Sequence, residues 1–305
     1  MPDPSADAPR PIVLFPGEPG SFAEDAVIAA FGEAVVATPV PTFHDLVTAL
    51  TEGPAPAGVL PIENVLFGTV RENYDLLADA ALTIVGEVIV PVRLCLAALP
   101  GERIESIERV YSHIQALGQS EAFLRQRPWS LLASTNTAGA GKMIRERGER
   151  GSAAVLSPRA AALFGLEVLA SDIQSNARNR TRFLILTRPG TDAPARVAPT
   201  SGIPGSTLLV SVRNEPGTLY RVLGVLASHG LNLSKLESRP SRSHAWEYVF
   251  WMDLDTDLCA PGAAPAMADL RDAAVDVRVM GCYPRAAEPF AGVEPVLPTD
   301  QESAI

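Results

Sequence analysis

The sequence is poor in lysine and has no block of basic residues. Only Lys142 and Lys235 are lysines, arginine supplies every other cation, and the formal net charge is −10. A protein that binds nucleic acid needs a basic patch or stripe that neutralises phosphates. The composition therefore argues against a nucleic-acid partner. A small anionic substrate stays compatible with it, provided that the fold builds local positive potential against its own net charge.

Cysteine and long apolar segments are also scarce. The three cysteines, Cys95, Cys259 and Cys282, are scattered and fit neither a zinc pattern nor a disulfide framework, which favours a reducing compartment. No stretch approaches the roughly 20 apolar residues of a membrane span. The opening MPDPSADAPRP lacks the apolar core of a signal peptide. We therefore expect a cytoplasmic protein without a membrane partner.

Between residues 12 and 188, short apolar segments alternate with segments of helical periodicity. This alternation predicts an α/β fold in which helices cover a mostly parallel sheet. Two extended segments, near 84–98 and 181–188, are expected to cross between two lobes. Lobe one would hold residues 12–83 plus 183–188, and lobe two residues 84–182. A cleft at the carboxyl ends of the strands would then take a ligand.

The remaining third of the chain has a different pattern. Residues 189–205 are rich in Pro, Gly and Ser and are predicted to be a linker. Residues 206–285 read as strand, helix, two strands, helix and strand, which is the order of a ferredoxin-like module. Residues 286–305 carry four acids, no bases and three prolines, so we expect a mobile tail.

Polar residues gather where the apolar segments of the first 188 residues end. PGEPGSF (16–22) offers glycines and a helix N-terminus with Ser21 as its N-cap and Glu24 at the capping-box position. Such a helix N-terminus suits an anion. Each of the other sites has a capping explanation of its own, but together they predict a polar cleft. They are Glu63 and Asn64, Ser112 with His113, Gln119, Thr137, and the cluster of Arg178, Arg180 and Arg182 around Thr181.

These segments resemble the prephenate dehydratase family with its C-terminal ACT regulatory domain. The matching stretches are PGEPGSFAEDA, VLPIENVLFGTV, YSHIQALGQSEAFL, NTAGAGK, NRTRFLIL, PGTLYRVL and NLSKLESRP, in the family's order. The resemblance covers residues 12–285, and the close relative arogenate dehydratase shares nearly all of it. It implies a two-lobed catalytic region like that of periplasmic binding proteins, residues 12–188, followed by an ACT domain, residues 206–285.

The resemblance also implies roles for individual residues. Thr181 would be the essential threonine that donates a hydrogen bond to the departing hydroxyl. Arg182 could hold a substrate carboxylate, although its side chain could equally point away from Thr181 along the strand. Loss of carbon dioxide and hydroxide makes the prephenate ring aromatic, so no metal or other cofactor is expected. The implied catalytic residues are Thr181, Glu63, Asn64, Ser112 and Gln119, and the implied substrate-binding residues are Arg182, Phe183, Thr137 and Ser21.

In the ACT domain the resemblance implies a phenylalanine site between two subunits of a homodimer or homotetramer. Its effector-binding residues would be Gly217, Thr218, Leu219, Glu237, Ser238, Arg239 and Pro240. The function implied is feedback-regulated prephenate dehydration in phenylalanine biosynthesis.

Three positions depart from the family's usual residues, and they keep alternatives open. Val65 replaces a hydroxyl residue, Ile114 replaces a proline, and Asn136 replaces a serine or aspartate. Val65 bears on substrate preference, so arogenate dehydratase stays a rival with the same chemistry. A small-molecule sensor that uses the same cleft without catalysis is a rival of another class.

Overall fold

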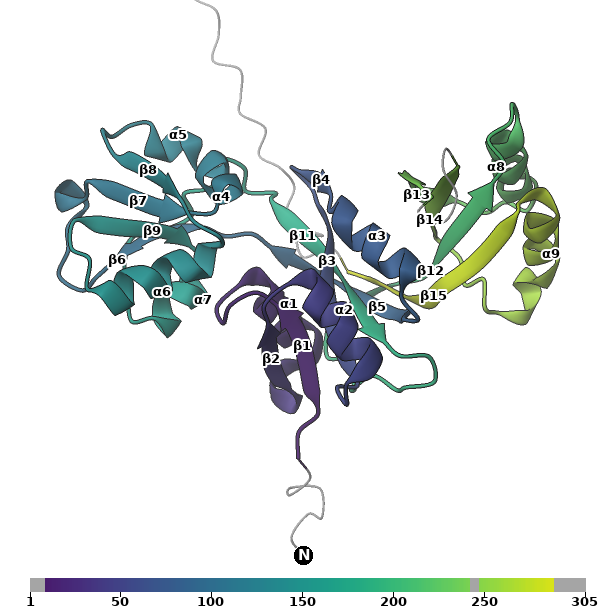
Figure 1. Ribbon diagram of the computed structural model, residues 1–305, viewed down its shortest axis with the longest axis horizontal. Coiled ribbons are helices and arrows are strands. Elements are labelled where there is room, and N and C mark those ends of the chain that lie inside the picture. The colour runs from purple at the N-terminus through teal and green to yellow at the C-terminus, as the bar shows by residue number, and fades with distance from the viewer. Residues whose placement is uncertain (1–8, 242–246, 288–305) are drawn as a thin grey trace, which may run out of the picture.

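The computed structural model describes residues 9–241 and 247–287. They form three parts in a row, with lobe two at one end, lobe one in the middle and a C-terminal module at the other end (Figure 1). The N-terminal residues 1–8 and all but the first two residues of the predicted tail lie outside the described residues. No helix in the described ranges is long and apolar enough to cross a membrane.

Lobe one is built on a mixed sheet with the order β2-β1-β3-β11-β5, and the short β4 pairs with β3. β1 runs parallel to β2 and β3, whereas β11 runs antiparallel to β3 and β5. The expected mostly parallel sheet is therefore wrong, because β11 re-enters lobe one from lobe two. The strands are β1 Ile12–Pro16, β2 Val36–Val40, β3 Ala57–Asn64, β4 Gly68–Thr69, β5 Thr83–Pro91 and β11 Arg180–Thr187; the helices are α1 Phe22–Phe31, α2 Phe43–Glu52 and α3 Arg71–Asp79.

Lobe two holds a second mixed sheet with the order β10-β6-β9-β7-β8. β7 runs parallel to β8 and β9, and β6 runs antiparallel to β9 and β10. Helix α6 ends at Gly148, which takes the left-handed conformation that terminates many helices. The strands are β6 Cys95–Ala98, β7 Arg109–Ser112, β8 Ser130–Ala133, β9 Ser152–Leu156 and β10 Glu167–Ala170; the helices are α4 Ile114–Gln119, α5 Glu121–Leu124, α6 Thr137–Arg147 and α7 Pro158–Leu163.

Two connections, residues 92–94 and 171–179, join the lobes. They are bound to each other, since Val92 N donates to Asn179 O at 2.8 Å and Arg93 pairs with Asp172 at 2.8 Å. The predicted lobe boundaries near 83 and 182 need correction. β5 and β11 pair along their whole length inside the sheet of lobe one, so the crossings fall after Pro91 and before Arg180.

The C-terminal module has the predicted βαββαβ order and an antiparallel sheet, β13-β14-β12-β15. Helices α8 and α9 cover one face of this sheet, the face that points away from lobe one (Figure 1). The first strand begins at Thr200, so part of the predicted linker extends the sheet. The strands are β12 Thr200–Val212, β13 Leu233–Pro240, β14 Tyr248–Leu254 and β15 Asp276–Ala286; the helices are α8 Thr218–Ser228 and α9 Ala264–Ala273.

The other face of this sheet packs directly on lobe one. Leu209, Trp251 and Met280 of the module are buried in one cluster with Tyr74 and Ile84 of lobe one. The rings of Tyr74 and Trp251 meet edge to face with centroids 5.0 Å apart. A Cβ on Gly281 would lie 1.9 Å from Ile84 O, so only glycine permits this approach of β15 to β5. The module therefore shares a hydrophobic core with lobe one.

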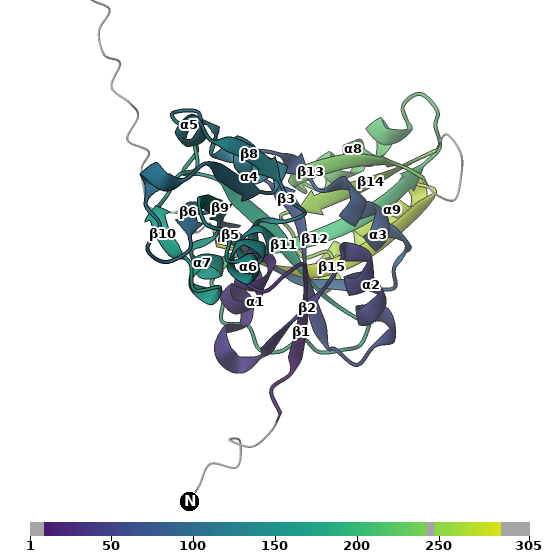
Figure 2. The same ribbon diagram turned by 60° about the vertical axis from the view of Figure 1, so that its left-hand side comes forward.

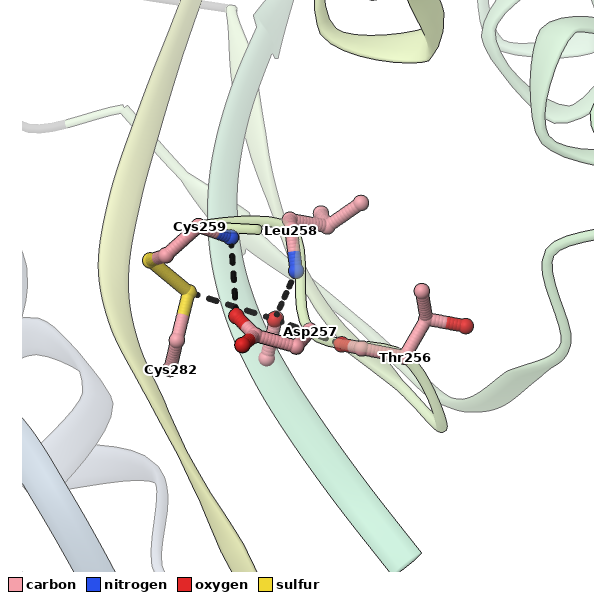
Figure 3. Close-up of a disulfide and its surroundings, with 6 residues drawn as sticks. Thr256, Asp257, Leu258, Cys259 and Cys282 are labelled. Carbon is pink, nitrogen blue, oxygen red and sulfur yellow. Dashed lines mark hydrogen bonds between the residues drawn. A yellow bond between two sulfur atoms is a disulfide. The ribbon is translucent and has the colours of Figure 1, made fainter. Parts of the chain in front are cut away.

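The cysteines require a correction to the sequence-based expectation. Cys259 and Cys282 form a disulfide that joins the segment before α9 to β15 (Figure 3), and their Cα atoms lie 6.1 Å apart. The spacing did not reveal the pair because the partners are brought together by the antiparallel fold, not by a short motif. A carboxylate oxygen of Asp257 lies within 4.8 Å of both sulfur atoms. These three residues are the one cluster among the described residues with the spacing of metal ligands, but the two sulfurs are bonded to each other. Cys95 is a buried free thiol.

We expect loss of this disulfide to lower stability without changing the fold. It spans 23 residues, and closing a loop of that size removes conformational entropy from the unfolded chain worth about 3 kcal/mol. Urea unfolding of Cys282→Ser, and of the wild type with a thiol reductant, should show this loss in the free energy of unfolding. An unchanged midpoint in both experiments would mean that the two thiols do not pair.

Candidate active site

A cleft with a volume of about 480 Å³ lies between lobe one and lobe two. This size suits a small-molecule ligand. Lobe one and the strands that enter it contribute Pro16, Ser21, Phe22, Ala23, Phe43, Pro61, Asn64, Phe67, Gly68, Thr69, Val70, Thr181 and Phe183; lobe two and its connection contribute Val92, His113, Gln115, Ala116, Gln119, Thr135, Asn136 and Thr137. Figure 2 shows α1 of lobe one beside α6 and α7 of lobe two.

The centre of the lobe-one wall is a hydrogen-bonded pair, Asn64 and Thr181. They are direct neighbours across the antiparallel strands β3 and β11. Asn64 Nδ2 donates to Thr181 Oγ1 at 3.0 Å and to Asn179 Oδ1 at 2.9 Å. The orientation of this amide is fixed, because Asn64 Oδ1 accepts from the backbone N–H groups of Leu66 and Phe67 at 2.9 and 3.1 Å.

This arrangement determines what the Thr181 hydroxyl can do. A hydroxyl has one hydrogen to donate and two lone pairs that accept. Asn64 occupies a lone pair, so the hydrogen of Thr181 stays available for an oxygen atom in the cleft. The side chain is thus prepared as a neutral hydrogen-bond donor and not as a base.

The cleft wall contains two helix N-termini and no cationic side chain among the described residues. The described residues that line the cleft include no lysine or arginine. Helix α1 starts at Phe22 and helix α6 at Thr137, and the first residues of both lie in the cleft wall. Free backbone N–H groups at such ends, together with the helix dipole, favour an anion.

Ser21 is the N-cap residue of α1, as predicted, but its side chain does not cap the helix. Its hydroxyl makes no cap bond and has no partner although the atom is buried. Glu24 cannot complete a capping box, because its carboxylate accepts from Gly20 N at 2.6 Å and pairs with Arg159 of lobe two. The unpartnered Ser21 hydroxyl lies beside the N-terminus of α1, where it can donate to a ligand.

Two charged residues expected in the site lie outside the cleft. Arg182 points to the opposite face of β11 and pairs with Glu87 and with Asp253 of the C-terminal module, both at 2.6 Å. Glu63 pairs with Lys235 of the same module at 2.8 Å. Successive side chains of a strand alternate between its two faces. Because Thr181 and Asn64 face the cleft, Arg182 and Glu63 face away from it. The predicted carboxylate grip of Arg182 is therefore wrong.

The other predicted residues divide between the cleft wall and the core. Ser112 is fully buried and its hydroxyl donates to Val155 O at 2.5 Å, so it fixes strand β9 against β7 and does not line the cleft. His113 lines the cleft and caps α4, with Nδ1 accepting from Gln115 N at 3.3 Å. Ser21, Gln119, Thr137 and Phe183 lie in the cleft wall as expected.

Sequence reasoning missed Asn179 and the aromatic wall. Asn179 is buried and accepts from Asn64, and its place two residues before Thr181 in NARNRTRF was the available signal. Phe22, Phe43 and Phe67 line the cleft from three separate elements. Each stands next to a turn or a helix start, where an aromatic residue carries no sequence signal of its own. These side chains offer an apolar surface for a ring.

Comparison with known proteins agrees with this geometry. The sequence model of the prephenate dehydratase family matches residues 13–191, and that of the ACT domain matches residues 206–271. The chain belongs to the prephenate dehydratase family. Arogenate dehydratase/prephenate dehydratase 1 of Arabidopsis thaliana is 34% identical to it over 290 residues, which cover 89% of this chain and 71% of that protein.

Solved structures of relatives have the same architecture. The prephenate dehydratase of Arthrobacter aurescens, solved in complex with L-Phe, is 31% identical with a TM-score of 0.80 and covers 90% of each chain. A protein described as a novel type of quorum-quenching acylase is 34% identical with a TM-score of 0.80, covering 92% of this chain and 99% of its own. The predicted two-lobed catalytic region and C-terminal ACT domain are confirmed.

The two motifs predicted to bind an effector lie in different surroundings in this prephenate dehydratase family member. Gly217, Thr218 and Leu219 line a pocket together with Tyr248 and Phe250. Strand β13 carries the other motif at the edge of the sheet, where Glu237 and Arg239 turn toward lobe one. Its other residues, Ser238 and Pro240, are exposed.

The lobes of this family member also touch directly beside the cleft. Ser157 Oγ donates to Gly20 O at 2.8 Å, and a Cβ on Gly20 would lie 2.8 Å from the backbone of Ala160. Gly20 also has a φ of +84°, so glycine is required here both by this backbone conformation and by the close approach of Ala160. Arg159 reaches Glu24 at 3.3 Å and Asp25 at 3.5 Å. Burial raises the pKa of Asp25 to about 6, although Arg159 opposes the shift.

We expect Asp25→Asn to stabilise the protein above pH 6. A carboxyl whose folded pKa exceeds its unfolded value favours folding at low pH and loses that contribution as the pH rises through about 6. Asparagine removes this loss, worth about 1–3 kcal/mol after allowance for solvent screening. Urea unfolding at pH 4.5 and pH 8 should show a smaller fall for the variant than for the wild type. Equal pH slopes in the two proteins would contradict the raised pKa.

Proposed function

We propose that this protein converts prephenate to phenylpyruvate, the dehydration step of phenylalanine biosynthesis. The observation that carries the proposal is the Asn64–Thr181 hydrogen bond, which leaves the threonine hydrogen free for a leaving oxygen in a cleft without charged lining residues. Membership of the prephenate dehydratase family supports the same reaction.

The reaction needs a donor and an anion site, and the cleft offers both. The bond from the prephenate ring to its carboxylate breaks, and its electron pair makes the ring aromatic as the bond to the hydroxyl breaks. The hydroxyl leaves as water after taking up a proton that comes finally from solvent. A hydrogen bond from Thr181 stabilises the negative charge that grows on this oxygen. Aromatisation supplies the driving force.

Substrate binding in this proposal uses helix ends and aromatic side chains. The two carboxylates of prephenate would face the N-termini of α1 and α6, with Ser21 and Thr137 as additional donors. The ring would lie against the phenylalanines of the wall, and Gln119 would contact its polar edge. Rigid placement between two lobes that touch each other provides the orientation that such a unimolecular reaction needs.

The test of this proposal is turnover of prephenate by the full chain, followed by the absorbance of phenylpyruvate. Arogenate is the second substrate to test, because the Arabidopsis relative is named for both activities and Val65 stands, 55% exposed, at the tip of the β3–β4 hairpin. A higher kcat/KM for arogenate would reverse the assignment within the same chemistry. Prephenate binding without turnover would instead support a sensor.

Acyl-amide hydrolysis, suggested by the name of one solved relative, fits the cleft less well. A nucleophilic hydroxyl needs an acceptor that takes its proton. Asn64 donates to Thr181 and so cannot serve as that acceptor.

We also propose that phenylalanine regulates the enzyme through the ACT domain. The pocket at Gly217, Thr218 and Leu219 would bind it, together with the motif Glu237–Pro240 contributed by a second subunit of a homodimer or homotetramer. The solved relative with L-Phe supports this ligand. Calorimetry should detect the binding of phenylalanine. Prephenate should lower the affinity for phenylalanine by the same factor by which phenylalanine lowers the affinity for prephenate. Sedimentation should show a dimer or tetramer; a monomer that still responds to phenylalanine would contradict the shared site.

Location in the cytoplasm also remains a proposal, supported by the biosynthetic reaction. Stable disulfides are rare in the cytoplasm. The test is therefore whether Cys259 and Cys282 are oxidised or reduced in protein whose thiols are alkylated at the moment of cell lysis; a fully oxidised pair would argue against this location.

A further inference from the structure

The strands that carry the catalytic pair also carry two residues that bind the ACT domain. Thr181 and Asn64 are cross-strand neighbours, and so are Arg182 and Glu63, one position along each strand. The first pair faces the cleft. The second pair faces the sheet of the ACT domain on the opposite side of lobe one. Each catalytic side chain is therefore one peptide unit away from an inter-domain ion pair.

Arg182 is held by groups from both domains. It binds Glu87 of lobe one, and it binds Asp253 and the Tyr283 hydroxyl of the ACT domain at 2.6 and 3.1 Å. Burial alone would raise the pKa of Asp253, but the charge and hydrogen bond of Arg182, together with the Thr207 hydrogen bond and the charge of Arg285, outweigh it, so the pKa is lowered. Thr207 donates to the second oxygen of Asp253 at 2.7 Å. A buried charge with this set of partners has one favourable geometry.

Glu63 is held in a similar way by strand β13, the strand of the second effector motif. Lys235 Nζ lies 2.8 Å from Glu63 Oε1 and 3.3 Å from Thr69 Oγ1. Thr69 in turn donates to Glu237 at 2.9 Å, and Thr69 itself lines the cleft. The β3–β4 hairpin is thus fastened to β13 at Glu63 and Thr69, on both of its strands. The same hairpin contains Leu66 and Phe67, whose N–H groups orient the Asn64 amide.

We propose that Lys235 and Asp253 of the ACT domain are positioning residues for Asn64 and Thr181. Lys235 acts through Glu63, and Asp253 acts through Arg182. The ACT domain then holds part of the catalytic geometry even without an effector. A ligand that shifts β13 would move the hairpin and with it the donor of Thr181. This inference depends on the proposed function only for its kinetic readout.

The experiment uses the full chain with Lys235→Met, which keeps the length of the side chain and removes its charge. Arg278→Met is the matched control, because Arg278 joins the same domain to lobe one through Ala78 O of α3, and this hydrogen bond involves neither β3 nor β11. We expect kcat for prephenate to fall roughly tenfold in Lys235→Met, with KM and melting temperature close to those of Arg278→Met. Asp253→Asn should lower kcat too, but its burial makes it the less decisive variant.

A double-mutant cycle separates a positioning role from a packing role. If Lys235 and Glu63 act as a pair, Glu63→Gln should cost the same in kcat as Lys235→Met, and the double variant should cost no more than either change. Additive losses, or equal kcat in Lys235→Met and the control, would overturn the proposal. Loss of kcat that simply follows loss of melting temperature would overturn it as well.

Hydrogen exchange supplies a readout that does not require turnover. In Lys235→Met the amides of Leu66 and Phe67 should exchange several-fold faster than in Arg278→Met, because their bonds to Asn64 depend on the fastened hairpin. Unchanged exchange at both amides would overturn the proposal even if prephenate proved not to be the substrate. Absence of prephenate turnover in the wild type alone would overturn only the proposed function.

Discussion

Thr181→Val should reduce kcat for prephenate by about 10²–10³, the usual cost of losing one donor to developing oxyanion charge. Valine keeps the β-branched shape of threonine, so β11 should retain its pairing with β3 and β5. KM should change little, because the hydrogen bond strengthens as the hydroxyl departs and contributes little to the bound ground state. Steady-state kinetics on phenylpyruvate formation measures both constants.

Two further variants make this result specific to the hydroxyl. Thr181→Ser retains the donor and should keep much more of the activity, with some loss because serine is free to rotate. Thr38→Val, on the edge strand β2 of the same sheet, repeats the chemical change away from the cleft and should leave kcat unaltered. Wild-type kcat in Thr181→Val would remove Thr181 from the mechanism.

Much of the fold follows from local patterns in the sequence. Apolar segments and helical periodicity predicted the alternating elements of both lobes, and the turn residues around 189–205 marked the change to the ACT domain. Directions of strands were not readable in this way. β11 enters lobe one in the reverse sense because the chain has crossed to lobe two and returned, and only the tertiary fold records that path.

The candidate site was predictable as a neighbourhood but not as a set of orientations. The triplet Thr181–Phe183 was recognised as a site segment, yet Thr181 and Phe183 face the cleft while Arg182 faces the ACT domain. Alternation along a strand requires that split, but sequence alone did not show which parity faces the cleft. Because the proposed substrate is a dianion, Arg182 was expected to pair with a substrate carboxylate. In the structure it pairs with the carboxylates of Glu87 and Asp253.

The surroundings of Ser21 were predictable only in part. Sequence indicated the N-terminus of the helix after PGEPGSF, and Ser21 does lie in the cleft wall. The expected capping box would have used up the serine hydroxyl. The structure has no such box: the Glu24 carboxylate accepts from Gly20 N and pairs with Arg159 of the other lobe, and the Ser21 hydroxyl makes no cap bond. Inter-lobe contacts of this kind carry no local signal.

Asn64→Asp should impair catalysis as severely as loss of the Thr181 hydroxyl, although it replaces only NH₂ by oxygen. The carboxylate would still accept from the N–H groups of Leu66 and Phe67. Toward Thr181, however, it would present an acceptor in place of a donor. Since hydrogen bonds to a carboxylate are about twice as strong as neutral ones, the threonine hydrogen would turn away from the cleft.

The expected kinetic result is a fall in kcat of about 10²–10³, and three further measurements identify its cause. The double variant Asn64→Asp/Thr181→Val should be no slower than Thr181→Val, because both changes remove the same donor. Lowering the pH should restore part of the activity of Asn64→Asp relative to the wild type, since a protonated carboxyl donates to Thr181 again.

Asn176→Asp is the control, because it adds the same charge in the loop before β11. There the side-chain oxygen accepts a hydrogen bond from Arg178 N, which an aspartate can also accept, so this variant should retain most activity. An equal loss in Asn176→Asp would assign the effect to charge near the cleft and not to the direction of the hydrogen bond.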